Sequence, residues 1–226
     1  MSFSGYTDQT FEFFMALRFN NNRAFFLDNR DWYLQSVREP SLELCKELAT
    51  AMQQIDPLLE TRPHRVVARI NRDVRFSRDK SPYRDHIWLC YRRPEQERGV
   101  SPGFYFETDA QGAYYGMGFY LPNRPLMNAL RRQMRTAPAA LEAIFADLGG
   151  EFSLYGEAFK RLKAPPEVPE ALRDWYVRKS LYLEKRLPLA RLKSAQLVGE
   201  LRQGWSRLEP MYTYLQNCVP EKEDSL

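Results

Sequence analysis

Residues 69–84, RINRDVRFSRDKSPYR, group the side chains of this chain that are best suited to binding or catalysis. Arginine presents a planar fork of donors that suits carboxylate and phosphate, and lysine presents a compact positive charge. Aspartate can hold such cations in place or act as an acid or base. We therefore expect a cationic pocket for an anionic small molecule. The predicted anion-binding residues are Arg69, Arg72, Arg75 and Lys80, and the candidate catalytic residues are Asp73, Asp79 and Tyr83.

The same side chains also fit a second interpretation, a structural network of arginines and aspartates that ties a loop to a sheet. Other catalytic signatures are missing from the sequence. Gly116-Met117-Gly118 lies inside a strand pattern and opens no helix, so it is not a phosphate-binding fingerprint. The histidines and cysteines lack metal-ligand spacing, so no metal site is expected, and the residues indicate no particular cofactor.

Positive charge is concentrated in two blocks, although the formal net charge of the chain is only +4. Residues 62–93 and 158–193 are strongly basic, whereas the first 61 residues carry more acidic than basic side chains. Basic blocks of this kind suit an anionic ligand or a nucleic acid. Acidic residues are interleaved in the first block, which makes nucleic-acid binding the weaker of the two hypotheses.

The side chains of residues 69–84 must be positioned by the secondary structure around them. Val66, Ala68 and Ile70 alternate with other residues, which predicts a strand over residues 66–76. That strand would place Arg69, Asp73 and Arg75 on one face and lead into a loop over residues 77–82. Further strands are expected over residues 86–91, 103–108, 113–121 and 181–187, with a hairpin loop at residues 109–112.

Helices are expected on both sides of this sheet. Helical spacing of apolar residues follows Asp8, a plausible N-cap, and the run Asn20-Asn21-Asn22 interrupts it. Further helices are expected near residues 22–33, 40–56, 125–135, 138–148, 169–179 and 194–215. This order predicts an α+β fold, a single domain over residues 1–219 with a central antiparallel sheet packed by N-terminal and C-terminal helices. Residues 220–226 are expected to be a disordered acidic tail.

The remaining composition bears on location. No uninterrupted run of apolar residues approaches the length of a membrane span. The N-terminus has no basic region followed by an apolar run, which a signal peptide would have. Three widely spaced cysteines indicate reduced thiols. We therefore expect a cytoplasmic protein without a membrane partner, and the sequence favours no particular oligomeric state.

The string Arg69-x-x-Arg72-Asp73-x-Arg75-Phe76-x-x-Asp79-Lys80-x-Pro82-Tyr83-Arg84 resembles the signature of an uncharacterised bacterial and fungal family, domain of unknown function 2461. The family's signature usually ends in lysine, where this chain has Arg84. Asn21-Asn22 and Phe25-Phe26 resemble the family's Asn-Asn-x-x-Trp-Phe motif, with Phe25 in place of tryptophan. Pro102-Gly103-Phe104-Tyr105, Gly116-x-Gly118 and Arg131 also fit, so the resemblance spans roughly residues 3–217.

The resemblance implies one whole-chain domain and no particular activity. It adds Asn21, Asn22, Tyr105 and Arg131 as candidate ligand-binding residues, if they approach the charged segment. Three hypotheses remain open: an anionic small-molecule site that could be catalytic, a nucleic-acid-binding surface, and a non-enzymatic scaffold with a structural arginine–aspartate network.

Overall fold

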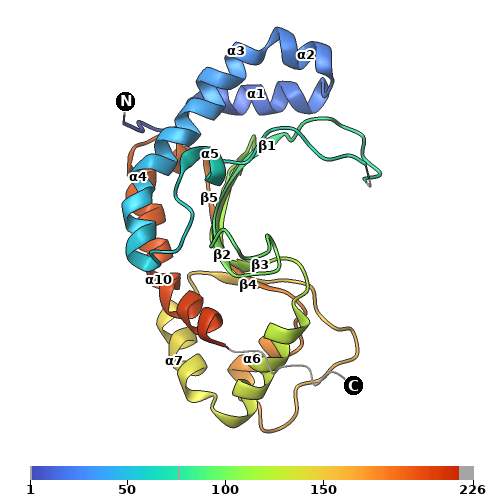
Figure 1. Ribbon diagram of the computed structural model, residues 1–226, viewed down its shortest axis with the longest axis vertical. Helices are drawn as coiled ribbons and strands as arrows, with labels where there is room; N and C mark the ends of the chain where they lie inside the picture. The colour runs from blue at the N-terminus through green and yellow to red at the C-terminus, as the bar shows by residue number, and fades with distance from the viewer. Residues whose placement is uncertain (1, 76, 219–226) are drawn as a thin grey trace. The chain divides into compact units, whose positions relative to one another are not determined.

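The computed structural model describes residues 2–75 and 77–218, and the statements below concern these residues. Five strands form one antiparallel sheet in the order β1-β2-β3-β5-β4, and helices precede it, follow it and also lie between β3, β4 and β5 in the chain (Figure 1). The strands are β1 (His86–Tyr91), β2 (Gly103–Asp109), β3 (Ala113–Phe119), β4 (Ser153–Tyr155) and β5 (Leu181–Leu187). The predicted α+β class with an antiparallel sheet is therefore confirmed.

Hydroxyl and amide side chains set the starts of the first two helices. Helix α1 (Asp8–Phe19) begins after Thr7, whose backbone N–H donates to Thr10 Oγ1 over 3.3 Å, so the cap is one residue before the expected Asp8. Helix α2 (Arg23–Asp28) begins after Asn22, whose side-chain oxygen accepts from the Phe25 N–H over 3.0 Å. The predicted break at the asparagine run is confirmed.

The next helical stretch runs from Arg30 to Ile55 and changes its hydrogen-bonding pattern in the middle. It comprises α3 (Arg30–Tyr33), the π-helical η1 (Leu34–Arg38) and α4 (Glu39–Ile55). Pro40 has no N–H and its ring crowds the carbonyl four residues earlier, which belongs to Ser36. That carbonyl instead accepts a hydrogen bond from Thr10 Oγ1 over 2.6 Å. The π-helical segment therefore lies where Pro40 prevents the regular α-helical hydrogen bond to the Ser36 carbonyl.

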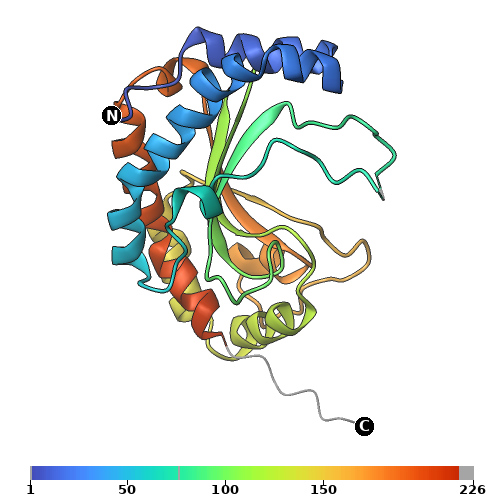
Figure 2. The same cartoon turned by 45° about the horizontal axis from the view of Figure 1, so that its top comes forward.

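The described chain divides into two compact units. The first comprises residues up to 93 together with 105–115 and 186–203, and the second comprises residues 94–104, 116–185 and those from 204 onward. In the first unit, α4 lies over one face of β1, and the Tyr91 hydroxyl donates to the Cys45 carbonyl over 3.4 Å. The beginning of α10 (Gln196–Asn217) lies beside α4 (Figures 1 and 2). The predicted single domain stays a prediction.

The second unit holds most of the helices after β3. They are α6 (Arg124–Thr136), α7 (Ala139–Leu148), η2 (Glu170–Leu172), α8 (Arg173–Tyr176) and the later part of α10, whereas α9 (Leu189–Leu192) belongs to the first unit. Gly118 on β3 has φ +148°, and a Cβ there would lie 2.2 Å from the Leu181 carbonyl oxygen. A glycine is needed here because the backbone of β5 approaches too closely for a side chain.

The predicted strand over residues 66–76 is wrong. Residues 63–66 form the short helix α5 (Pro63–Val66), and only single bridges follow, at Val67 and at Asn71. Val66 and Val67 are adjacent and both buried, which a strand with one buried face does not allow. Phe76 and the predicted tail at residues 220–226 lie outside the described residues.

No helix in the described ranges has both the length and the apolar character needed to cross a membrane.

Candidate functional site

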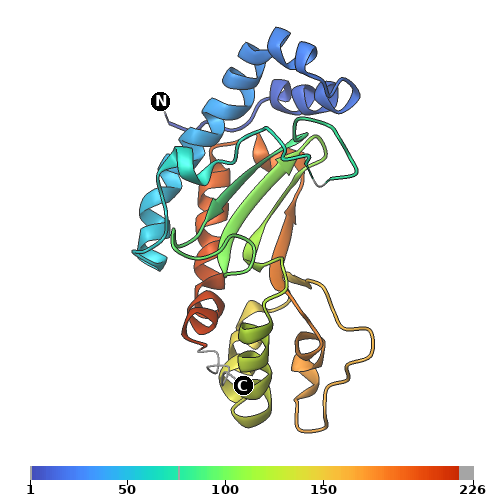
Figure 3. The ribbon, with the colours of Figure 1, turned by 45° about the vertical axis from the view of Figure 1, so that its right-hand side comes forward.

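The charged segment lies in a long loop between α5 and β1, which we call the arm (residues 67–85 without 76). Figures 2 and 3 show it extending away from the sheet within the first unit. The arm folds back on itself at its base, where Asn71 and Tyr83 form an antiparallel bridge. The Arg72 N–H donates to the Pro82 carbonyl over 2.9 Å, and the Arg84 N–H donates to the Ile70 carbonyl over 2.7 Å. The two ends of the signature therefore lie side by side.

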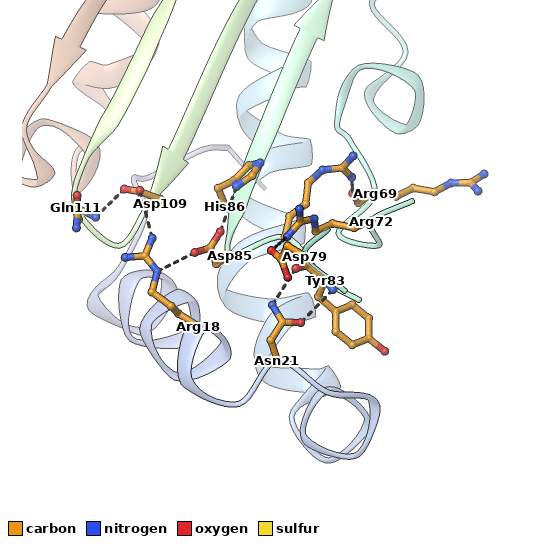
Figure 4. A network of polar contacts seen from close by, with 11 residues as sticks. Arg18, Asn21, Arg69, Arg72, Asp79, Tyr83, Asp85, His86, Asp109 and Gln111 are labelled. Carbon is orange, nitrogen blue, oxygen red and sulfur yellow. Dashed lines mark hydrogen bonds and ion pairs between the residues drawn. The ribbon is translucent and has the colours of Figure 1, made fainter. Parts of the chain in front are cut away.

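Asn21 fixes the second half of the arm, at Tyr83, to the N-terminal helices. Its Nδ2 donates to the Tyr83 carbonyl over 2.9 Å, and its Oδ1 accepts from the Tyr83 N–H over 3.1 Å (Figure 4). The Tyr83 ring is buried and stacks on Phe26, with ring centroids 4.2 Å apart. The Asn21 amide thus acts as a one-residue strand partner for Tyr83, and Asn22 caps α2.

Ion pairs neutralise two arginines in the outer part of the arm. Arg75 Nη2 lies 2.6 Å from Asp73 Oδ2, and Arg72 pairs with Asp79. Lys80 Nζ donates to the Val74 carbonyl over 3.0 Å. These side chains lie at the surface: Asp73 is 59% exposed and Arg75 77%. The predicted anion-binding cations of this part therefore already have partners.

Hydrogen bonds lower the pKa of Asp73 and of Asp79, the two aspartates in the outer part of the arm. The Arg75 guanidinium and N–H hold the pKa of Asp73 at about 2. Hydrogen bonds from Ser81, and then from Arg72, hold the pKa of Asp79 at about 2. Carboxylates of such low pKa are weak bases at neutral pH, so this geometry suits positioning better than proton abstraction.

Arg84 fixes the base of the arm next to Arg69. Its Nη1 donates to the Arg69 carbonyl over 2.7 Å and to the Asn71 carbonyl over 2.8 Å. Only the backbone of Arg69 takes part in these bonds. The Arg69 side chain is thereby available on a backbone that is held in place.

Arg69 borders a shallow pocket of about 200 Å³ in the first unit. Arg30 at the start of α3 and Arg38 at the end of η1 border the same pocket. Its complete lining is Arg30, Tyr33, Leu34, Arg38, Arg69, Ile70 and Asn71, and no residue of this set is acidic. We call it the arginine pocket. Sequence reasoning missed Arg30 and Arg38, because both lie in the acidic N-terminal part of the chain.

A second polar network joins α1 to the ends of β1 and β2. Arg18 Nε donates to Asp85 Oδ2 over 2.7 Å, and Arg18 Nη2 lies 3.9 Å from Asp109 Oδ2 (Figure 4). His86 Nδ1 lies 3.4 Å from Asp85 Oδ1. Burial of Asp85 acts to raise its pKa, but the hydrogen bond and charge of Arg18 outweigh this and lower it. The network anchors the end of the arm to α1.

The structure does not bring the other predicted ligand residues to the arginine pocket lining. Tyr105 lies half exposed on β2 in the first unit. Arg131 lies in the second unit, where its Nε donates to the Tyr176 carbonyl over 2.7 Å and its Nη2 to the Arg178 carbonyl. Burial lowers the pKa of the Arg131 guanidinium.

In the two described ranges, no group of three His, Cys, Asp or Glu side chains is arranged to hold a metal ion.

Fold and site together define an α+β protein whose signature arm leaves the sheet beside an arginine-lined pocket. The chain belongs to the family described as "Conserved hypothetical protein (DUF2461)", which matches residues 9–214. The resemblance of the arm's sequence to that family is thereby confirmed. No curated protein matches the chain.

Proposed function

We propose that this protein binds a small anionic molecule in the arginine pocket, and that the arm holds one wall of that pocket. The observation that carries the proposal is the lining, which includes Arg30, Arg38 and Arg69 and no acidic residue. A cleft lined by one sign of charge attracts ions of the opposite sign. Guanidinium groups also offer carboxylates and phosphates paired donors.

The pairing of the arginines separates the pocket from the outer arm. Within the described part of the chain, the Arg30 and Arg69 side chains form no ion pair. Arg72 and Arg75, in contrast, are neutralised by Asp79 and Asp73. Of the cations predicted from the sequence, Arg69 is therefore the one that this proposal assigns to the ligand. The others support the arm, as the structural-network hypothesis expects.

The proposal concerns binding and includes no chemical step. Tyr83 supports the arm through its ring, which is stacked on Phe26. Nucleic-acid binding by the arm has less support, since Arg72 and Arg75 are already paired with Asp79 and Asp73 and so offer few new contacts to backbone phosphates.

Thermal stabilisation by anions tests the proposal. A panel of phosphorylated and carboxylated metabolites is screened by differential scanning fluorimetry. At a concentration ten times the Kd, a ligand stabilises the folded protein by about 1.4 kcal/mol, which raises the melting temperature by about 3–6 °C. An Arg69→Ala variant should lose that stabilisation while it keeps its own melting temperature, since the Arg69 bonds to Arg84 use the backbone.

Arg78→Ala is the matched control. Arg78 is an exposed arginine of the same arm that does not line the pocket, so its removal takes away the same charge. We expect Arg78→Ala to keep the ligand-induced shift. If no anion of the panel stabilises the protein, or if both variants lose the shift equally, the arginine pocket is not the ligand site.

A further inference from the structure

The charge and size of the arginine pocket bear on the class of its ligand. Three permanent positive charges border a pocket of about 200 Å³. A site for a whole drug-sized molecule is larger, from about 300 to 1,000 Å³. The pocket therefore suits a compact charged group with a short organic body. Tyr33, Leu34 and Ile70 provide an apolar wall for that body.

Arg38 and Arg69 lie on backbone that is held in place on two sides of the pocket. Arg38 ends the π-helical turn, a kind of distortion that is frequent at functional sites. The Arg38 guanidinium is close enough to the Tyr33 hydroxyl to lower the pKa of Tyr33, although burial has the larger effect and raises it. On the other side, Arg84 fixes the Arg69 and Asn71 carbonyls. A site held in this way needs less ordering when the ligand binds.

We infer that the ligand of the arginine pocket carries a terminal phosphate monoester; this rests on the proposed function. A carboxylate has one negative charge and two oxygens, which a single guanidinium already satisfies through paired bonds. Three guanidiniums match a group with three terminal oxygens and two negative charges. A phosphate monoester is such a group at neutral pH. A phosphodiester of a nucleic-acid backbone has one charge and two terminal oxygens, and matches less well.

Three small probes with similar organic bodies test the inference: ethyl phosphate, ethyl sulfate and propionate. Ethyl sulfate has the tetrahedral shape of ethyl phosphate but only one charge. NMR titration of the protein at pH 7.5 measures the affinity of each. We expect ethyl phosphate to bind at least about tenfold more tightly than either of the others, because the second charge interacts with all three guanidiniums.

Variants and pH assign the preference to this pocket. Arg30→Gln and Arg69→Gln should each weaken ethyl phosphate by about tenfold or more and bring it closer to ethyl sulfate. Arg78→Gln should leave all three affinities unchanged. Ethyl phosphate should also weaken at pH 5, because its second proton, with pKa about 6, is then bound. Ethyl sulfate stays singly charged over this range and should change little.

The outcomes separate the two proposals. If propionate or ethyl sulfate binds as tightly as ethyl phosphate and Arg69→Gln weakens both, the pocket binds anions and the phosphate inference is wrong. If none of the probes binds, both proposals fail. If ethyl phosphate binds tightly but Arg30→Gln and Arg69→Gln leave its affinity unchanged, the phosphate binds elsewhere and the pocket assignment is wrong.

Discussion

Removal of the Asn21 amide should release the arm from the N-terminal helices. In the bridge between Asn71 and Tyr83, the ladder hydrogen bonds are made by the residues on either side, Arg72 and Arg84. The Tyr83 N–H and carbonyl therefore face outward, and the Asn21 side chain satisfies both. Asn21→Ala leaves two polar groups of a buried residue without these partners.

The size of the effect follows from those two bonds. Each protein hydrogen bond contributes about 0.5–1.5 kcal/mol net, so Asn21→Ala should destabilise the arm by about 1–3 kcal/mol. If the whole protein unfolds in one step, its melting temperature falls by about 2–12 °C. If the arm opens locally, its amide hydrogens exchange about 5–150 times faster while the core is unchanged.

Amide hydrogen exchange is the assay that sees either outcome. The amides to follow are those of Arg72 and Arg84, which close the base of the arm. Asn20→Ala is the matched control, because the Asn20 side chain is exposed and donates to the Ala16 carbonyl of its own helix. Should Arg72 and Arg84 exchange as slowly in Asn21→Ala as in Asn20→Ala, Asn21 does not hold the arm. Its role as a ligand residue would then regain support.

Three further predictions concern single side chains. Gly118→Ala should destabilise the protein strongly, because the new Cβ would lie 2.2 Å from the Leu181 carbonyl oxygen. Gly199→Ala should instead stabilise it by about 0.5–1 kcal/mol, because a Cβ at this position of α10 lies in open space. Thermal melts measure both effects. In an NMR titration the Asp73 carboxyl should protonate near pH 2, so its pairing with Arg75 is complete above about pH 4 and is lost as the pH falls through about 2. Arg75→Ala should return the midpoint towards the ordinary value. Arg131→Met should lower the melting temperature without weakening ethyl phosphate, because Arg131 donates to carbonyls of its own unit.

The sheet was predictable where the pattern of the sequence matches the burial of the residues. In β1, Ile87, Leu89 and Tyr91 are buried in alternation with half-exposed neighbours. The hairpin after β2 was also predictable, because Asp109 accepts hydrogen bonds from the N–H groups of Gln111 and Gly112. In both features the local sequence pattern agrees with the observed structure.

The base of the arm was not predictable, because its apparent alternation has a different cause. Val66 ends a helical turn, Val67 bridges to β1, and Ile70 is buried beside the arginine pocket. Three different local environments therefore lie behind a sequence pattern that resembled one face of a strand. The predicted convergence of Arg69, Asp73 and Arg75 on that face failed with it.

The arginine pocket could not be predicted from the sequence for another reason. Arg30 and Arg38 are separated from Arg69 by more than thirty positions of chain and lie in a region whose charge is on balance acidic. Charge profiles average over neighbours in the sequence, so a positive pocket built from distant elements does not appear in them. Only the packing of α3 and η1 against the base of the arm reveals it.

The geometry at Arg84 accounts for the one departure of this chain from the signature it resembles. Both hydrogen bonds to the Arg69 and Asn71 carbonyls come from a single nitrogen, Nη1. A lysine ammonium carries three donors on one nitrogen, so it can also serve two carbonyls. The planar fork that distinguishes arginine from lysine is not needed for this pair of bonds. The last position of the signature is thus a cation that holds the backbone of Arg69, and either residue can hold it there.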